Sequence, residues 1–70
     1  MIGRITQLID DQQFGTIAGE DGNDYRFEGR SLLGMTFGSL HVGARVTFVA
    51  TVDTRRAAAV RIAPDIERLR

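Results

Sequence analysis

Residues 44–52 carry the clearest structural pattern in the chain, because apolar and polar side chains alternate there almost one by one. A period of two is typical of a β-strand that buries one face, since successive side chains point to opposite sides. One face is predicted to hold Val46, Phe48, Ala50 and Val52, and the other Arg45, Thr47, Val49 and Thr51. A chain built on this segment is expected to contain a sheet with one protected side.

Four further segments have the composition of strands, and turn signals separate them. They span residues 2–9, 14–18, 25–28 and 57–63. The turn between the second and third strands contains Asp21-Gly22, a strong hairpin signal. Five short strands joined by such turns predict an all-β fold, namely a small, closed or nearly closed, five-stranded antiparallel β-barrel. The alanines of residues 57–63 also allow a helix, which is the alternative for that segment.

The apolar positions of these segments define the expected core. In residues 25–28, Tyr25 and Phe27 face one side, whereas Arg26 and Glu28 face the other. The expected core residues are Ile5, Ile17, Tyr25, Phe27, Val46, Phe48 and Ile62, and Val60 is expected to share a face with Ile62. Residues 29–42 have no sustained period and are expected to form a loop, in which residues 31–33 make a short helical turn that plugs one end of the barrel.

The length of 70 residues suits one domain and no more. We expect the barrel to occupy residues 1–63 and a short turn or tail to follow over residues 64–70, because Pro64 ends the last strand. The N-terminus lacks the apolar core of a signal peptide, and no apolar run approaches the roughly 20 residues of a membrane helix. The expectation is a cytoplasmic protein without membrane contact, and the absence of cysteine agrees with it.

Residues that support metal or catalytic chemistry are scarce. The chain has no cysteine and one histidine, His41, whereas a structural zinc site normally uses about four nitrogen or sulfur ligands. Asp10 and Asp11 have no third ligand nearby, so a solvated turn is favoured over a metal or acid–base pair. The sequence contains no nucleophile with a base, no phosphate loop and no cofactor motif. We therefore expect a protein that is not an enzyme and holds no metal or cofactor.

Charge gives no decisive indication of a nucleic-acid partner. Nine basic and nine acidic residues cancel, so the strongly basic balance typical of nucleic-acid-binding domains is missing. All the basic residues are arginine. Two interpretations stay open: a bias of genome composition, or a use of guanidinium groups, which stack on planar partners and grip phosphates through two hydrogen bonds.

A family resemblance runs from residue 3 to about residue 62 essentially without gaps. Residues 12–17, which read Gln-Gln-Phe-Gly-Thr-Ile, resemble the Lys-Gly-Phe-Gly-Phe-Ile motif in the second strand of bacterial cold-shock proteins. Residues 24–28 are similar to the third-strand motif of that family, Asp-Val-Phe-Val-His. Residues 37–48 resemble its loop and fourth strand, and residues 55–62 its final segment. The resemblance implies a five-stranded barrel of the cold-shock-domain type, a variety of OB-fold.

The resemblance also implies a binding face, and this chain departs from it. In the family, aromatic side chains on one sheet face stack on unpaired bases, and basic groups follow the phosphates. Phe14 and Phe37 keep two of these aromatic positions. Other family positions, usually aromatic or histidine, hold Gln7, Thr16, Arg26, Glu28 and Gly29. Base stacking is worth roughly 1–3 kcal/mol per base, so losing three or four platforms removes on the order of 5 kcal/mol if the terms add.

The first hypothesis is a divergent cold-shock-like domain that binds single-stranded RNA or DNA weakly and with little sequence preference. The residues expected to bind are Phe14, Arg26, Phe37, Gln7, Thr16, Arg30 and Arg56, with Arg4 and Arg55 as further phosphate contacts. Arg26 is expected to recover part of the lost stacking through its guanidinium group. Glu28 opposes binding, because it sets a carboxylate against phosphate.

The second hypothesis is a protein-interaction or structural module that kept the barrel and lost nucleic-acid binding. The missing aromatic positions and the zero net charge favour it. The exposed face or an edge strand would then contact another protein, or a second copy in a homodimer. An arginine stripe beside Phe14 would favour nucleic acid, whereas a face of mixed sign would favour a protein partner.

Single residues have alternatives of their own. Phe14 can pack at the barrel mouth and Phe37 can anchor its loop instead of stacking on bases. Arg26 and Glu28 can take part in cross-strand ion pairs. Arg55 and Arg56 can simply be solvated in their turn.

Overall fold

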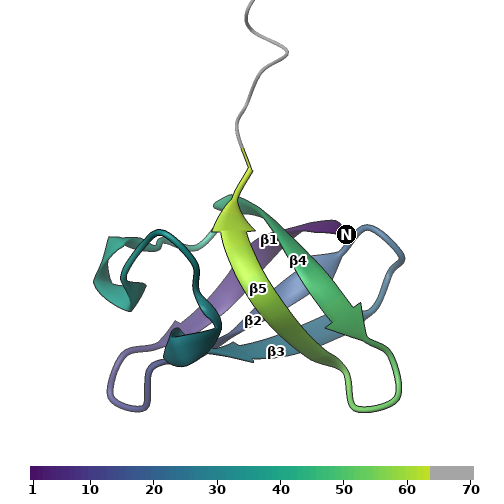
Figure 1. The fold of residues 1–70 in the computed structure, drawn as a ribbon, viewed down its shortest axis with the longest axis horizontal. Coiled ribbons are helices and arrows are strands. Elements are labelled where there is room, and N and C mark those ends of the chain that lie inside the picture. The colour runs from purple at the N-terminus through teal and green to yellow at the C-terminus, as the bar shows by residue number, and fades with distance from the viewer. Residues whose placement is uncertain (64–70) are drawn as a thin grey trace, which may run out of the picture.

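Residues 1–63, the part of the chain that the structure describes, form a closed β-barrel in the computed structural model of this protein (Figure 1). Its strands are β1 (Ile2–Ile9), β2 (Phe14–Gly19), β3 (Asp24–Glu28), β4 (Arg45–Thr51) and β5 (Arg56–Ile62). Around the barrel they follow the order β1-β2-β3-β5-β4. The predicted all-β fold is confirmed, and residues 56–62 are strand rather than helix. The turn or tail predicted at residues 64–70 lies outside the described residues.

The barrel is antiparallel except where β3 meets β5. That pair is parallel, with a bridge between Arg26 and Arg56, and the Arg26 amide donates a 2.8 Å hydrogen bond to the Arg55 carbonyl oxygen. The pairs β1–β2, β2–β3, β1–β4 and β4–β5 are antiparallel. An odd number of strands cannot alternate in direction all the way around a ring, so closure requires a parallel pair. This geometric rule refines the antiparallel barrel expected from the sequence.

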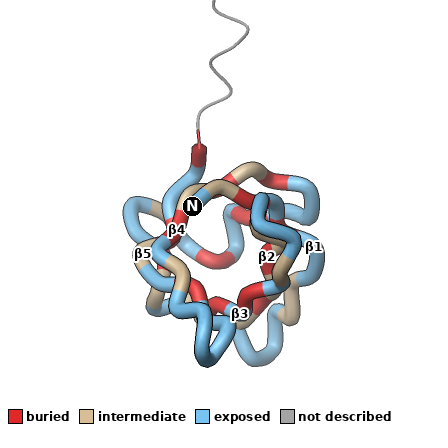
Figure 2. The backbone as a smooth tube through the Cα atoms, turned by 90° about the vertical axis from the view of Figure 1, so that its right-hand side faces the viewer, coloured by how far each residue is buried: buried red, intermediate tan, exposed pale blue. Residues whose placement is uncertain are grey.

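Apolar side chains fill the interior of the barrel. Figure 2 shows where the buried residues lie along the backbone that surrounds this interior. Six of the seven expected core residues are at most 3% exposed: Ile5, Ile17, Tyr25, Phe27, Val46 and Phe48. Val60 is buried as well. The ring centroids of Tyr25 and Phe48 lie 5.3 Å apart in a tilted arrangement, which aromatic pairs prefer to a face-to-face sandwich. The alternation in the sequence therefore located most of the buried face correctly.

Two residues predicted to face the core are exposed instead. Ile62 is 51% exposed, because it is the last residue of β5 at the end of the barrel, and the next residue, Ala63, is buried in its place. Val52 is 57% exposed, because β4 ends at Thr51 and the chain turns there. Both predictions extended the alternation to positions where the sheet is ending.

A β-bulge in β5 shifts the alternation of that strand by one residue. Ala59 and Val60 of β5 lie opposite a single residue of β4, Phe48. Ala59 has a φ of 52°, in the left-handed region. An extra residue of this kind bends a strand and increases its twist, which suits the curvature of a small barrel. The bulge also lets Ala57 and Val60, three residues apart, both point into the core.

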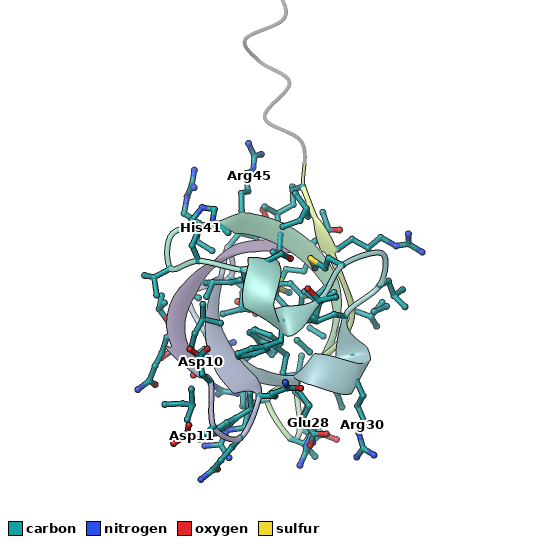
Figure 3. All side chains as sticks on the ribbon, turned by 90° about the vertical axis from the view of Figure 1, so that its left-hand side faces the viewer. Asp10, Asp11, Glu28, Arg30, His41 and Arg45 are labelled. Atoms are coloured by element: carbon teal, nitrogen blue, oxygen red, sulfur yellow. The ribbon has the colours of Figure 1, made fainter. Side chains whose placement is uncertain are left out.

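The loop between β3 and β4 covers one end of the barrel (Figure 3). It contains two 3-10 turns, η1 (Gly29–Ser31) and η2 (Phe37–Ser39). Leu32 follows η1 and is buried, and Phe37 is 6% exposed with its ring centroid 6.2 Å from that of Phe27. The predicted plug is therefore confirmed, although its first helical turn occupies residues 29–31 instead of 31–33.

Candidate nucleic-acid interface

A row of four side chains crosses the outside of β1, β2, β3 and β5. Strand pairing places Gln7 beside Thr16, Thr16 beside Arg26, and Arg26 beside Arg56. Paired residues of neighbouring strands share a face, so these side chains form one continuous strip, called here the outer row. Thr16 is half-buried and the other three are exposed. The structure thus brings together four residues that the sequence predicted to bind nucleic acid.

Phe14 supplies the aromatic surface beside the outer row. It lies two residues before Thr16 in β2, so both side chains leave the same face of the strand. The guanidinium carbon of Arg26 lies 5.1 Å from the centroid of the Phe14 ring, within the range of a cation–π contact. The other four aromatic residues of the chain, Tyr25, Phe27, Phe37 and Phe48, are buried. Phe14, which is half-buried, is therefore the aromatic residue that the outside of the barrel offers to a ligand.

Glu28 lies directly across from Phe14 in the β2–β3 pair and contacts two arginines. Its Oε1 accepts a 2.7 Å hydrogen bond from Nε of Arg30, and its Oε2 accepts a 3.4 Å hydrogen bond from Nη1 of Arg56. The positive charge of Arg30 holds the pKa of the Glu28 carboxyl below its usual range, so this group is ionised at neutral pH. The cross-strand ion pair of Glu28 is thus made with Arg56, while Arg26 lies over the Phe14 ring.

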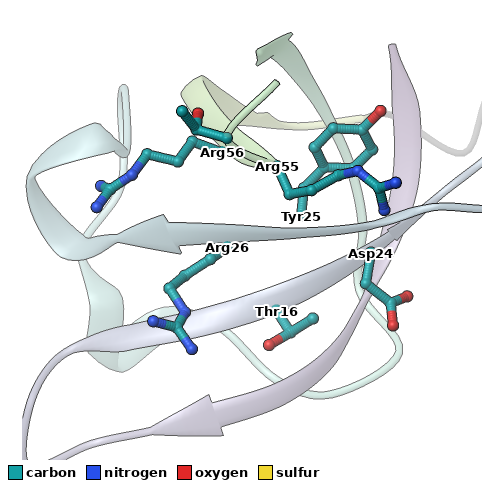
Figure 4. A pocket seen from close by; sticks show the side chains of 7 residues that line it. Thr16, Asp24, Tyr25, Arg26, Arg55 and Arg56 are labelled. Atoms are coloured by element: carbon teal, nitrogen blue, oxygen red, sulfur yellow. The ribbon is translucent and has the colours of Figure 1, made fainter. Parts of the chain in front are cut away.

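Two shallow hollows follow the outer row. The first, of about 340 Å³, is lined by Thr16, Asp24, Tyr25, Arg26, Thr54, Arg55 and Arg56. The second, of about 280 Å³, is lined by Gln12, Phe14, Arg26, Glu28 and Arg56. Figure 4 shows the first hollow, with the guanidinium groups of Arg26 and Arg56 toward the left of the view and that of Arg55 on the right, beside Tyr25. Because the two hollows share Arg26 and Arg56, they form one open surface.

The charge of this surface is mixed but positive on balance. Four guanidinium groups, from Arg26, Arg30, Arg55 and Arg56, outnumber the two carboxylates of Asp24 and Glu28. The whole chain has a formal charge of zero, so positive charge is concentrated here relative to the rest of the molecule. The surface therefore carries arginines beside Phe14 together with two carboxylates, so it has mixed sign with a positive balance.

Two turns border the surface, and each holds a non-glycine residue in the left-handed region. Gln13 precedes β2 with a φ of 53°, and Arg55 precedes β5 with a φ of 55°. Their carbonyl oxygens accept hydrogen bonds of 2.7 and 2.8 Å from the amides of Gly29 and Arg26. A left-handed conformation costs an L-residue about 1–2 kcal/mol, so contacts with β3 and the residue after it help to hold both turns.

Two residues expected to bind do not lie on this surface. Phe37 is buried beneath the loop that follows β3, so the exposed ring predicted for it is not found, and the alternative of a loop anchor describes it correctly. The exposed side chain of Arg4 donates a 3.0 Å hydrogen bond from Nη1 to the Gly43 carbonyl oxygen. It is therefore turned toward the loop that precedes β4 and away from Phe14.

Sequence reasoning missed two features of the surface. Asp24 lines the first hollow, and its alternation with Arg26 was a signal that could have placed it on the outer face. The contact between Glu28 and Arg56 joins residues 28 positions apart, and no local pattern indicates such a pair.

Comparisons with known proteins do not indicate what this surface binds. No protein-family model matches the chain, and no curated protein matches it significantly. Within residues 1–63, no helix is long and apolar enough to cross a membrane, and no three His, Asp or Glu side chains gather where they could hold a metal ion. The residues of the outer row and their neighbours are therefore the features of this chain that bear on its function.

Proposed function

We propose that this protein is a cytoplasmic, divergent cold-shock-like domain that binds single-stranded RNA or DNA weakly and with little sequence preference. The binding surface is the outer row together with Phe14. The observation that carries the proposal is the contact between Arg26 and the Phe14 ring, 5.1 Å from guanidinium carbon to centroid, beside Arg56.

The Phe14–Arg26 pair gives a flat surface on which a base can stack. Unpaired bases stack both on aromatic rings and on guanidinium planes. Every base has a π-face, so stacking tolerates changes of sequence. This pair replaces the several aromatic platforms of the family with one composite platform, which supports binding of low specificity.

The arginines around this platform are placed to follow a phosphate backbone. Arg56 lies next to Arg26 on the neighbouring strand, and Arg55 lines the same hollow. Guanidinium groups bind phosphate oxygens through paired hydrogen bonds. Because arginines outnumber carboxylates on this surface, it attracts a polyanion even though the whole chain is formally neutral.

One platform and a few phosphate contacts set the expected affinity. A stacked base contributes roughly 1–3 kcal/mol. Non-specific electrostatic binding at physiological salt typically has a Kd of about 10⁻⁴ to 10⁻⁶ M. We therefore expect a Kd in that range for a short oligonucleotide, falling as the salt concentration is lowered.

A titration of a fluorescent single-stranded oligonucleotide at low salt tests the proposal. Phe14→Ala and Arg26→Ala should each weaken binding by about fivefold or more, because each removes half of the stacking pair. Arg61→Ala is the matched control. It removes an exposed arginine from the same strand as Arg56, but at the opposite end, where Arg61 pairs with Thr47.

Two results would contradict the proposal. One is the absence of binding at about 100 μM protein, the weak limit for non-specific binding. The other is binding that Phe14→Ala leaves unchanged, or that Arg61→Ala weakens as much as Arg26→Ala does.

A second candidate function is binding to another protein or to a second copy of the chain. The C-terminal part of β4 favours this function. The pairing of β1 with β4 ends at Thr47, followed by hydrogen bonds between Met1 and Phe48. Beyond that point Val49 is 61% exposed, and an open strand edge with an apolar side chain can recruit another strand. Sedimentation velocity over a range of concentrations tests this function. It requires a dimer that Val49→Lys dissociates, and a sharp monomer throughout would exclude self-association.

A further inference from the structure

We propose that Glu28 is a built-in competitor for phosphate, which keeps Arg30 and Arg56 occupied until a nucleic-acid strand displaces it. The inference rests on the proposed function and identifies the residue that limits its affinity. It comes from the contacts of this side chain, which lie at the centre of the binding surface.

The arrangement around Glu28 is the one that a bound phosphate would have. Each carboxylate oxygen faces a different guanidinium group, at 2.7 Å from Nε of Arg30 and 3.4 Å from Nη1 of Arg56. Phosphate oxygens accept hydrogen bonds from guanidinium groups in the same way. The two arginines belong to η1 and β5, so they converge on this carboxylate from separate elements.

The ion pairs of Glu28 are exposed enough to be exchanged for phosphate. The side chains of Arg30 and Arg56 are 86% and 59% exposed, and that of Glu28 is 37% exposed. Pairs this open to solvent add little to folding stability. The carboxylate therefore competes for the arginines without fixing them.

The position of Glu28 makes this competition unavoidable for a bound strand. Its Cα partner across the β2–β3 pair is Phe14, and the same hollow is lined by Arg26. A strand that stacks a base on the Phe14–Arg26 pair carries its phosphates past the carboxylate. Glu28 then repels the strand directly and also withholds two of its phosphate contacts.

Glu28→Gln tests the inference, because glutamine keeps the shape of the side chain and removes its charge. Each phosphate contact to a single strand contributes a slope of about −0.7 to log K against log[salt]. With the contribution of this contact taken as zero at about 1 M salt, one released arginine should raise the affinity for oligothymidylate about eightfold at about 50 mM salt and about threefold at about 200 mM salt. The slope should steepen by about 0.7 for each arginine released.

Asp24→Asn is the matched control for this experiment. It removes one negative charge from the same strand and the same surface, and within residues 1–63 Asp24 makes no ion pair that the change could break. We expect a smaller gain in affinity and an unchanged salt slope. In an Arg30→Ala/Arg56→Ala background, Glu28→Gln should lose most of its effect, because no arginine remains to be released.

The outcomes separate this inference from the proposed function. If the wild type binds and Glu28→Gln gains no more than Asp24→Asn, the competitor role is wrong while the binding function stands. If Glu28→Gln binds where the wild type does not, the competitor role is supported. If neither protein binds, the proposed function fails and the competitor role fails with it.

Discussion

The hydroxyl group of Tyr25 donates a 2.6 Å hydrogen bond to Oδ2 of Asp21, and this bond ties the barrel core to the turn between β2 and β3. Asp21 also accepts hydrogen bonds of 3.1 Å from the backbone amide and the side-chain amide of Asn23. The Tyr25 ring is buried, so Asp21 satisfies the one polar atom of its side chain. The bond lowers the pKa of Asp21 and raises the pKa of Tyr25.

Stability is expected to fall at both ends of the pH range because of this pair. The Asp21 pKa is lowered from 3.8, so its contribution is present above about pH 4 and is lost as the pH falls through the folded-state value. The Tyr25 pKa is raised from 10.0, so its contribution is present below about pH 10 and is lost as the pH rises through the folded-state value.

Urea unfolding of the wild type and Tyr25→Phe over this pH range measures the effect. The difference in unfolding free energy should be constant near neutral pH and should shrink below about pH 4 and above about pH 10. A difference that does not vary with pH would show that the hydrogen bond does not discriminate between the protonation states of Asp21 and Tyr25.

Phe37 and Phe14 are expected to respond to substitution in opposite ways. Phe37 is buried against Phe27, so Phe37→Ala should destabilise the fold by about 3–5 kcal/mol and Phe37→Leu by about 1 kcal/mol. The folded Phe37→Leu protein should bind oligonucleotide as the wild type does. Phe14→Ala should cost little stability and weaken binding by about fivefold or more. Thermal unfolding and oligonucleotide titration of both variants check this contrast, and weaker binding by folded Phe37→Leu would contradict it.

Gly15 and Gly38 should tolerate a methyl group very differently. A Cβ on Gly15 would lie 2.6 Å from the Gln7 carbonyl oxygen and 2.8 Å from Cε1 of Phe27, whereas one on Gly38 would meet nothing within 4 Å. Gly15→Ala should therefore cost about 1–3 kcal/mol, because backbone or a core ring must move. Gly38→Ala should stay within about 0.5 kcal/mol of the wild type. Equal unfolding free energies for the two variants would refute the close packing of β1 and β2 at Gly15.

Gln13→Gly is expected to stabilise the protein. Gln13 has a φ of 53°, and relief of its left-handed strain, about 1–2 kcal/mol, exceeds the added entropy of an unfolded glycine, about 0.4–1 kcal/mol. The net gain should be about 0.5–1 kcal/mol. Gln12→Gly is the control, because Gln12 itself has no left-handed conformation to relieve, and it should lose about 0.4–1 kcal/mol. Denaturant unfolding distinguishes the two signs.

Arg26 and Arg56 should differ in how well lysine replaces them. Lysine keeps the charge and loses the planar group, so Arg26→Lys should weaken oligonucleotide binding about two- to fivefold through the lost stacking with Phe14. Arg56→Lys should have a smaller effect, because a phosphate contact needs mainly the charge. Both variants should keep the salt slope of the wild type, because lysine keeps the charge. A changed slope would show that lysine does not preserve the phosphate contact of the arginine that it replaces.

Periodicity within single segments was enough to predict the five strands and most of the core. The alternation of Tyr25 with Arg26, and of Val46 and Phe48 with their neighbours, depends on the period of a strand, which is a local property of the chain. The same alternation placed Arg26 and Glu28 on the outer face. Where a local rule stopped applying, at Val52 and Ile62, the prediction failed because the strands end there.

Which outer side chains contact one another depends on how distant segments pair in the closed barrel. The parallel β3–β5 pair places Arg56 beside Arg26 and within reach of Glu28, and packing against Phe27 draws Phe37 into the core. These contacts depend on strand register and on barrel closure between distant segments, and single-strand periodicity carries neither. The alternation within single segments therefore predicts the strands of the barrel, whereas the contact of Arg26 with Phe14 and that of Glu28 with Arg56 exist only once the barrel has closed.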